Sequence, residues 1–183
     1  MDTAISALSD NEQTESHNLL FGVRRSIRYH HRRCRFFDGF DKFVKVISVL
    51  FGSAAFAAAT AQHSVIIMVC AGLVAVFSAI NLVVGPAQAA RLHEELARKF
   101  AKLEYDIVRA NNLTRDQLNQ FQAERLMIET EEPPPLRVLD TICHNELCEA
   151  LGYDRCEFYK VGFFQSLFAH IVDLWPSRIR KEK

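Results

Sequence analysis

The sequence predicts an all-α protein, a two-span transmembrane helical hairpin with amphipathic cytoplasmic helices before and after it. The main observation is that no Asp, Glu, Lys or Arg occurs from Val46 to Ala90, a run of 45 residues in a chain whose charged content is 24%. A bilayer core needs about 20 helical residues, so this run fits two spans better than one. An arginine-rich segment precedes the run, and an amphipathic helical pattern follows it. These three observations exclude an ordinary soluble globule.

The two spans are expected at about residues 43–61 and 64–85. The polar stretch at residues 60–64 separates them, and Gly85-Pro86 predicts a bend where the chain leaves the apolar layer. Lys and Arg flank both spans but do not occur in the short connection. The positive-inside rule therefore places both termini in the cytoplasm and the connection outside.

Small residues recur at helical spacing in both expected spans. Close approach through small side chains is how membrane helices associate, because lipid supplies little hydrophobic drive. The pattern predicts helix packing, either within one hairpin or between subunits. The expected helix-packing residues are Ser48, Gly52, Ala55, Ala59, Gly72, Ala75 and Ala79.

A second stripe on the later span contains Asn81, the single amide side chain within either span. A polar group inside a membrane needs a partner, so Asn81 is expected either to form a hydrogen bond between helices or to line a wet pore. The pore-lining candidates are Ala71, Val74, Ser78, Asn81 and Gly85.

Residues 1–15 are polar and acidic and are expected to be a disordered tail, and residues 16–132 are expected to form the two-transmembrane helical domain. Leu20, Val23, Ile27, His31 and Cys34 form the apolar stripe of a basic amphipathic helix. Its arginines predict contact with the anionic inner leaflet, with a simple topology signal and an anion or nucleotide site as alternatives. These arginines are Arg24, Arg25, Arg28, Arg32, Arg33 and Arg35.

After the spans, an amphipathic helix is predicted from residues that recur every three or four positions, namely Leu92, Leu96, Phe100, Leu103 and Ile107. Asn111-Asn112 is expected to interrupt it, and Thr114 with Gln117 predicts a capping box that starts another helix. Three prolines at 133–135 predict an extended linker. Residues 136–183 then predict a small helical appendage of two or three helices, whose most apolar helix contains Val161, Phe164, Phe168, Ile171, Val172 and Trp175.

Candidate sites for chemistry are weak. Cys143, His144, Cys148 and Cys156 are the one metal-like cluster, but their spacing is not that of a standard zinc site, so core cysteines are the simpler reading. Ser166, His170 and Asp173 do not have a hydrolase arrangement on one short helix. His30-His31 lies among arginines and is read as a solvated basic face rather than a pH sensor. We therefore expect no enzyme, no cofactor and no metal, and the zero net charge argues against a nucleic-acid binder.

The layout resembles the SLATT group of two-transmembrane effector domains in bacterial conflict systems. The resemblance covers about Ser16–Val108 and rests on the arginine-rich helix, the Phe36-Phe37-Asp38 junction, the hairpin, and the helix that begins Ala90-Arg-Leu-His93-Glu-Glu-Leu96. It implies an effector in the bacterial inner membrane that oligomerises and perforates the membrane when a partner senses infection. Such a partner would be a separate protein that senses or synthesises nucleotides.

The function expected from these features is that of an oligomeric, pore-forming or membrane-disrupting effector in bacterial antiviral defence. The first alternative is a non-conducting membrane anchor or scaffold that presents cytoplasmic helices to a partner. A phage-type holin is a third reading. A pore should require its own span sequences, whereas an anchor should still function with an unrelated hairpin.

Overall fold

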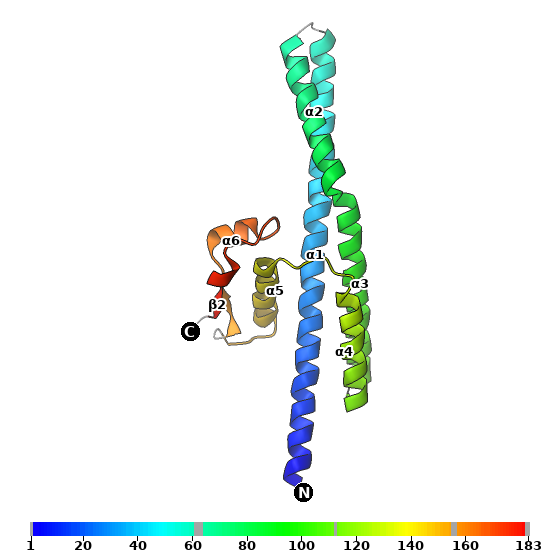
Figure 1. Ribbon diagram of the computed structural model, residues 1–183, viewed down its shortest axis with the longest axis vertical. Coiled ribbons are helices and arrows are strands. Elements are labelled where there is room, and N and C mark those ends of the chain that lie inside the picture. Colours follow the sequence, from blue (N-terminus) through cyan, green and yellow to red (C-terminus); the bar gives the residue numbers. More distant parts are fainter. Residues whose placement is uncertain (1, 61–63, 112, 155–156, 182–183) are drawn as a thin grey trace. The chain divides into compact units, whose positions relative to one another are not determined.

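The computed structural model describes residues 2–60, 64–111, 113–154 and 157–181, and most of them are helical (Figure 1). The all-helical expectation is therefore confirmed in its coarse form. In chain order the elements are α1 (Asp2–Thr60), α2 (Ser64–Val84), α3 (Pro86–Ala110), α4 (Arg115–Glu129), α5 (Arg137–Ala150), β1 (Tyr159–Lys160), α6 (Phe163–Phe168), the 3-10 turn η2 (Pro176–Arg178) and β2 (Arg180–Lys181).

The chain divides into two compact units. Residues 1–32 and 94–183 form one of them, here called the bundle unit, and residues 33–93 form the other, here called the hairpin unit. Helices α1 and α3 contribute residues to both units.

Helix α1 differs from the expected tail, because residues 2–15 are helical rather than disordered. No Gly or Pro occurs before Gly22. A helix that is already fixed by the packing of Leu19 and Val23 can extend backwards without a new nucleation step. An ion pair between Glu15 and Arg115 Nη1, at 2.5 Å, ties this end of α1 to α4.

The core of the bundle unit lies between α1, α3 and α4. Leu96, Phe100, Leu103 and Ile107 on α3 are at most 3% exposed, as their spacing predicts, whereas Leu92 is exposed. They pack with residues of the other two helices, which are Leu19, Val23, Leu118 and Ile128. The capping box that starts α4 is also confirmed, since the side chains of Thr114 and Gln117 bond to each other's backbone N–H groups.

The C-terminal region packs on α1 through a second cluster that contains Tyr29, Val138, Leu139, Cys143 and Ala169. The prolines form the predicted irregular linker, and the first N–H after them, from Leu136, donates to the Tyr29 hydroxyl at 3.0 Å. The appendage was expected to contain two or three helices, and it contains α5 and α6 together with a short strand pair that was not expected. Strands β1 and β2 pair antiparallel, and α6 is only six residues long.

The hairpin unit contains the end of α1, all of α2 and the start of α3. The Phe43 and Phe77 rings meet edge to face at 6.4 Å, so α1 and α2 lie side by side (Figure 1). The predicted bend is confirmed at Gly85, whose positive φ of 56° separates α2 from α3. Pro86 then occupies the first position of α3, where its missing N–H has no cost.

One continuous stretch of the described residues, Ser64–Ala110, is long and apolar enough to cross a membrane. It contains α2, which matches the expected second span to within one residue. The expected first span at residues 43–61 is not found by the same criterion. The search covered only the described residues, and the end of this expected span lies outside them.

Candidate functional site: a polar groove in the hairpin unit

A groove of about 570 Å³ lies between α1 and α2 in the hairpin unit. Helix α1 lines it with Val44, Lys45, Ser48 and Val49, and α2 lines it with Ser78, Asn81 and Leu82. Two serines and an asparagine thus face one hollow in a segment whose other side chains are mostly apolar. Polar groups at membrane depth are found where they line a cavity or face another helix.

The carboxamide oxygen of Asn81 is buried and accepts no hydrogen bond from the described residues. An unsatisfied buried acceptor costs about 1–3 kcal/mol. A donor from water, an ion or a second copy of the chain would remove that cost. Asn81 therefore has a buried acceptor that the described residues of the hairpin unit do not satisfy.

A buried carboxylate pairs with Lys45, one of the residues that line the groove. The side chain of Asp41 is 10% exposed and is bonded at 2.5 Å to Nζ of Lys45, which itself lines the groove. One turn earlier, the exposed pair of Asp38 and Lys42 repeats this i,i+4 arrangement at 2.6 Å. The sequence analysis missed Asp41, although its spacing to Val44 and Ser48 would have placed it on the same face.

The predicted pore-lining residues share one face of the helix but differ in burial. Val74, Asn81 and Gly85 are half-buried, whereas Ala71 and Ser78 are exposed. The face of α2 that packs on α1 is marked by buried or half-buried residues at helical spacing, which are Ile67, Cys70, Val74, Phe77 and Asn81. Only Ser78 and Asn81 of the predicted stripe line the groove.

The predicted helix-packing residues mostly lie away from the contact between α1 and α2. Ser48 and Ala55 are half-buried, but Gly52, Ala59, Gly72, Ala75 and Ala79 are exposed. A Cβ atom added to Gly52 or Gly72 would meet no atom within 4 Å. Within the hairpin unit the two helices pack through larger side chains, and most of the small residues are exposed.

Three of the six arginines expected to contact lipid pair instead with carboxylates of the bundle unit. Arg24 bonds Glu104 at 2.7 Å, Arg25 lies 3.1 Å from Asp140, and Arg32 bonds Glu146. Burial raises the pKa of Asp140, and the charge of Arg25 opposes that rise. These three guanidinium groups bind the helices of the bundle unit to one another.

The other three arginines have different environments. The Arg33 guanidinium lies 4.5 Å from the centre of the Phe37 ring, within the range of a cation–π contact. Arg28 is half-buried and Arg35 is exposed.

A buried histidine was missed by the sequence analysis, which placed His31 rather than His30 on the apolar stripe. The side chain of His30 is 1% exposed, its ring stacks on Phe100 at 5.6 Å, and its Nε2 lies 3.0 Å from Glu132 Oε1. His31 is exposed. The sequence pattern that could have predicted this burial is the seven-residue spacing from Val23, which places His30 two helical turns further along the same face.

We expect His30→Ala to lower the free energy of unfolding of the bundle unit by about 1–3 kcal/mol, because it leaves the Glu132 carboxylate without this partner. His31→Ala is the matched control, since an exposed substitution usually changes stability by less than about 0.5 kcal/mol. Urea titrations followed by circular dichroism in mild detergent measure both. Equal destabilisation by the two variants would show that the contact of His30 with Glu132 has no stabilising role.

The other candidate sites from the sequence lie in the bundle unit. Among the described residues, no group of three or more His, Cys, Asp or Glu side chains is placed to hold a metal ion. His144 contacts Cys148 at 3.4 Å, and Cys156 lies outside the described residues. Asp173 accepts hydrogen bonds from the N–H groups of Arg137 and Val138, so it caps α5.

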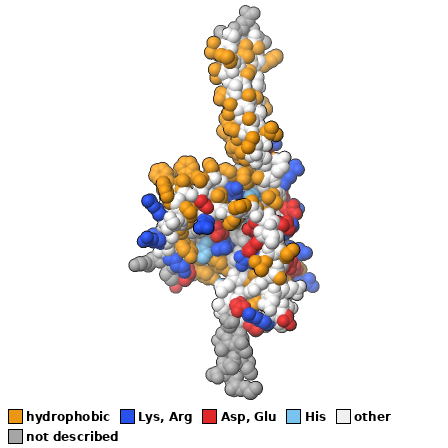
Figure 2. All heavy atoms as spheres, in the orientation of Figure 1, with side chains coloured by type: hydrophobic (Ala, Val, Ile, Leu, Met, Phe, Trp, Pro, Cys, Tyr) orange, Lys and Arg blue, Asp and Glu red, His pale blue; other side chains and the backbone are white. Residues whose placement is uncertain are grey.

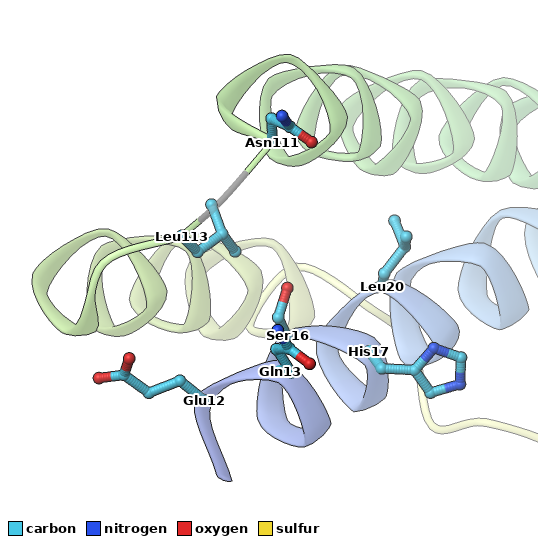
Figure 3. Close-up of a pocket in the computed structure, with 7 residues that line it drawn as sticks. All are labelled: Glu12, Gln13, Ser16, His17, Leu20, Asn111 and Leu113. Carbon is cyan, nitrogen blue, oxygen red and sulfur yellow. The ribbon is translucent and has the colours of Figure 1, made fainter. Parts of the chain in front are cut away.

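A second hollow, of about 470 Å³, lies in the bundle unit near the turn between α3 and α4 (Figure 3). Glu12, Gln13, Ser16, His17 and Leu20 of α1 line it together with Asn111 and Leu113. Figure 3 shows the His17 ring turned away from Leu113, and that ring bonds the Tyr153 hydroxyl. Five of the seven side chains that line this open hollow are polar.

Comparison with known proteins gives no relative from which a function could be transferred. No family model matches the chain, and no curated protein and no solved structure matches it. The candidate site is therefore assigned from the structure alone. It is the polar groove lined by Ser48, Ser78 and Asn81 between two helices of the hairpin unit.

Proposed function

We propose that the protein is an oligomeric inner-membrane effector of bacterial antiviral or conflict defence, whose hairpin unit forms a pore or disrupts the membrane. The observation that carries the proposal is the buried, unbonded carboxamide oxygen of Asn81 in a groove that also contains Ser48 and Ser78. One hairpin encloses no channel, so several copies would have to bring their grooves together.

The exposed surface of the hairpin unit supports two membrane crossings. On α1, Val46, Val49, Leu50 and Phe56 are 57–75% exposed, and α2 exposes most of its apolar side chains as well. A contiguous apolar surface of this kind is unusual in water and is typical of a lipid-facing helix. With two crossings and an uncharged connection, the proposal has both termini on the cytoplasmic side, as the positive-inside rule predicts.

The exposed small residues support association between copies. Gly52 on α1 and Gly72, Ala75 and Ala79 on α2 let a neighbouring helix approach closely. A donor on that neighbour would complete Asn81. A hydrogen bond between membrane helices is worth about 0.6–2 kcal/mol, which is about a 3- to 30-fold change in the association constant for each contact.

We expect Asn81→Leu to remove most of the depolarisation caused by the wild-type chain, because leucine fills the groove and cannot form the bond between copies. The measurement is membrane potential with a voltage-sensitive dye, in expressing bacteria and in proteoliposomes. Val76→Leu is the matched control, since Val76 is 55% exposed on α2 and does not line the groove. Wild-type protein that leaves the potential unchanged in both systems would contradict the pore.

The alternative is a non-conducting anchor or scaffold that presents the bundle unit to a partner. The ion pairs of Arg24, Arg25 and Arg32 favour it, because they give the bundle unit a defined structure outside the hairpin unit. Replacing residues 43–85 by an unrelated two-span hairpin separates the two functions. An anchor keeps its activity after this exchange, whereas a pore loses it.

A further inference from the structure

The C-terminal region of the bundle unit exposes a patch of large apolar side chains that nothing in the described chain covers. The patch comprises α6 and the turn after it, with Phe163 at 75%, Phe164 at 64%, Leu167 at 59%, Ile171 at 67% and Trp175 at 57% exposure. A Phe or Trp side chain has about 150–250 Å² of surface, so the three aromatic residues alone expose on the order of 400 Å². That matches the largest apolar patch of a typical soluble monomer, which is often a functional surface.

The patch is built by buried polar contacts and is not a frayed end. The side chain of Gln165 is buried, and its Nε2 donates to the carbonyl oxygens of Leu174 and Trp175 at 2.9 and 3.0 Å. Its Oε1 accepts the N–H of Gly162 at 2.9 Å. One buried amide therefore fixes both ends of the α6 turn, so that the apolar side chains are held outward.

Trp175 has a backbone conformation that a bulky residue rarely adopts. Its φ is 44°, in the left-handed region, where a side chain other than glycine is strained. Its carbonyl accepts from Gln165, and the Arg178 guanidinium lies 5.3 Å from the centre of its ring. The backbone at Trp175 is thus strained, and the ring of this single tryptophan is exposed beside a cation.

The segment that carries the patch has more basic than acidic side chains. Residues 159–183 contain five basic and two acidic side chains. Lys160, Arg178 and Arg180 are exposed, and the carboxylate of Asp173 is bonded to the start of α5. Figure 2 shows hydrophobic side chains gathered over α6 with Lys and Arg side chains nearby. A partner with anionic groups would therefore complement the charge of this surface.

We propose that this patch docks on the anionic surface of the membrane, with Trp175, Phe163, Phe164 and Ile171 in the headgroup region and the cations on lipid phosphates. Tryptophan and phenylalanine beside Lys and Arg are typical of surfaces that lie in the membrane interface. Each cation near an anionic leaflet contributes about 1 kcal/mol. The proposal rests on the membrane location of the chain and is independent of whether the hairpin unit conducts.

The single tryptophan lets the full-length protein report its own position. We would reconstitute one copy per nanodisc, in phosphatidylcholine alone or with phosphatidylglycerol, and measure fluorescence quenching by acrylamide and by brominated lipids. Docking predicts several-fold lower access of acrylamide to Trp175 in the anionic discs. It also predicts stronger quenching by lipids brominated near the headgroup than by lipids brominated near the bilayer centre.

A pair of charge variants tests the electrostatic part. Lys160→Gln combined with Arg180→Gln removes two exposed charges near the patch, and should abolish the difference between the two lipid compositions. Lys102→Gln with Arg109→Gln removes the same charge from exposed positions on α3 and should leave that difference intact. Circular dichroism checks that all variants keep their helices.

Two results would overturn the proposal. Equal acrylamide access in both compositions, without quenching by brominated lipid, would mean that the patch faces water. Shielding that arises only when two copies share a disc would assign the patch to a second copy of the chain. If the wild-type chain does not depolarise membranes but Trp175 is still shielded in anionic discs, the pore is overturned and this inference stands.

Discussion

Leu118→Ala is expected to lower the free energy of unfolding of the bundle unit by about 2–5 kcal/mol, because it removes buried methyl groups and leaves a cavity. Leu118 is 1% exposed and belongs to the cluster between α1, α3 and α4. Urea titration of the full chain in mild detergent, followed by the fluorescence of Trp175 and by circular dichroism, measures the change. Trp175 is a suitable probe because it lies in the same unit.

Leu126→Ala is the matched control for this experiment. Leu126 lies on the same helix, α4, but is 61% exposed, so the same chemical change should alter stability by less than about 0.5 kcal/mol. The difference between the two variants therefore isolates burial from helix propensity. Equal effects would contradict the packing of α4 against α1 and α3.

The thiol of Cys143 is expected to react with maleimide about 1000-fold more slowly in the folded protein than in urea at pH 8. Burial raises its pKa from 9.0 to about 12, against the opposing charge of Arg32. The thiolate is the reactive form, so a pKa higher by about three units leaves about a thousandth of the usual thiolate. Peptide mapping after timed labelling measures the rate at Cys143 directly, and the unfolded chain is its own reference.

The same shift predicts how stability changes in alkali. Below pH 9.0 the thiol is protonated in both states, so it has no pH-dependent effect on stability. Between pH 9 and about 12 the unfolded thiol loses its proton while the folded thiol keeps it. The unfolding free energy should therefore fall by up to about 1.4 kcal/mol per pH unit over this range. Cys143→Ala should remove this part of the slope, and an unchanged slope would contradict the raised pKa.

Local patterns of the sequence were sufficient for several elements. The spacing of Leu96, Phe100, Leu103 and Ile107 predicted the buried face of α3. Thr114 with Gln117 predicted the start of α4, and Gly85-Pro86 predicted the break before α3. In each case the physical cause lies within a few residues, because helix periodicity, capping and proline geometry are local properties.

The length and register of α1 were harder to predict. A polar N-terminal segment was expected to be disordered, yet it extends a helix whose packing lies further along the chain. The apolar stripe was also assigned slightly out of register, so that His31 was chosen and His30 missed. Two adjacent histidines among arginines differ only in which of them meets Phe100 and Glu132, and those partners lie far away in the sequence.

The candidate groove was found only in part. Asn81 and Ser78 were singled out because they are polar within an apolar run, which the sequence shows directly. Ser48 was assigned to packing and Asp41 was not considered, because their place beside Lys45 and the groove depends on how α1 pairs with α2. The exposure of Gly52 and Gly72 follows from the same pairing.

The sequence by itself determined the helical class, the uncharged run and the positions where helices start and break, because each depends on the chemistry of neighbouring residues. The tertiary structure decided which charges are neutralised and which apolar groups stay exposed. Arg24, Arg25 and Arg32 pair with acids on α3 and α5 that are 80 or more residues away. The apolar residues from Val161 to Trp175 form the six-residue helix α6 and a turn instead of one long helix. Gln165 donates to the carbonyl of Leu174, and Asp173 accepts from the N–H of Arg137, which the folded chain brings close.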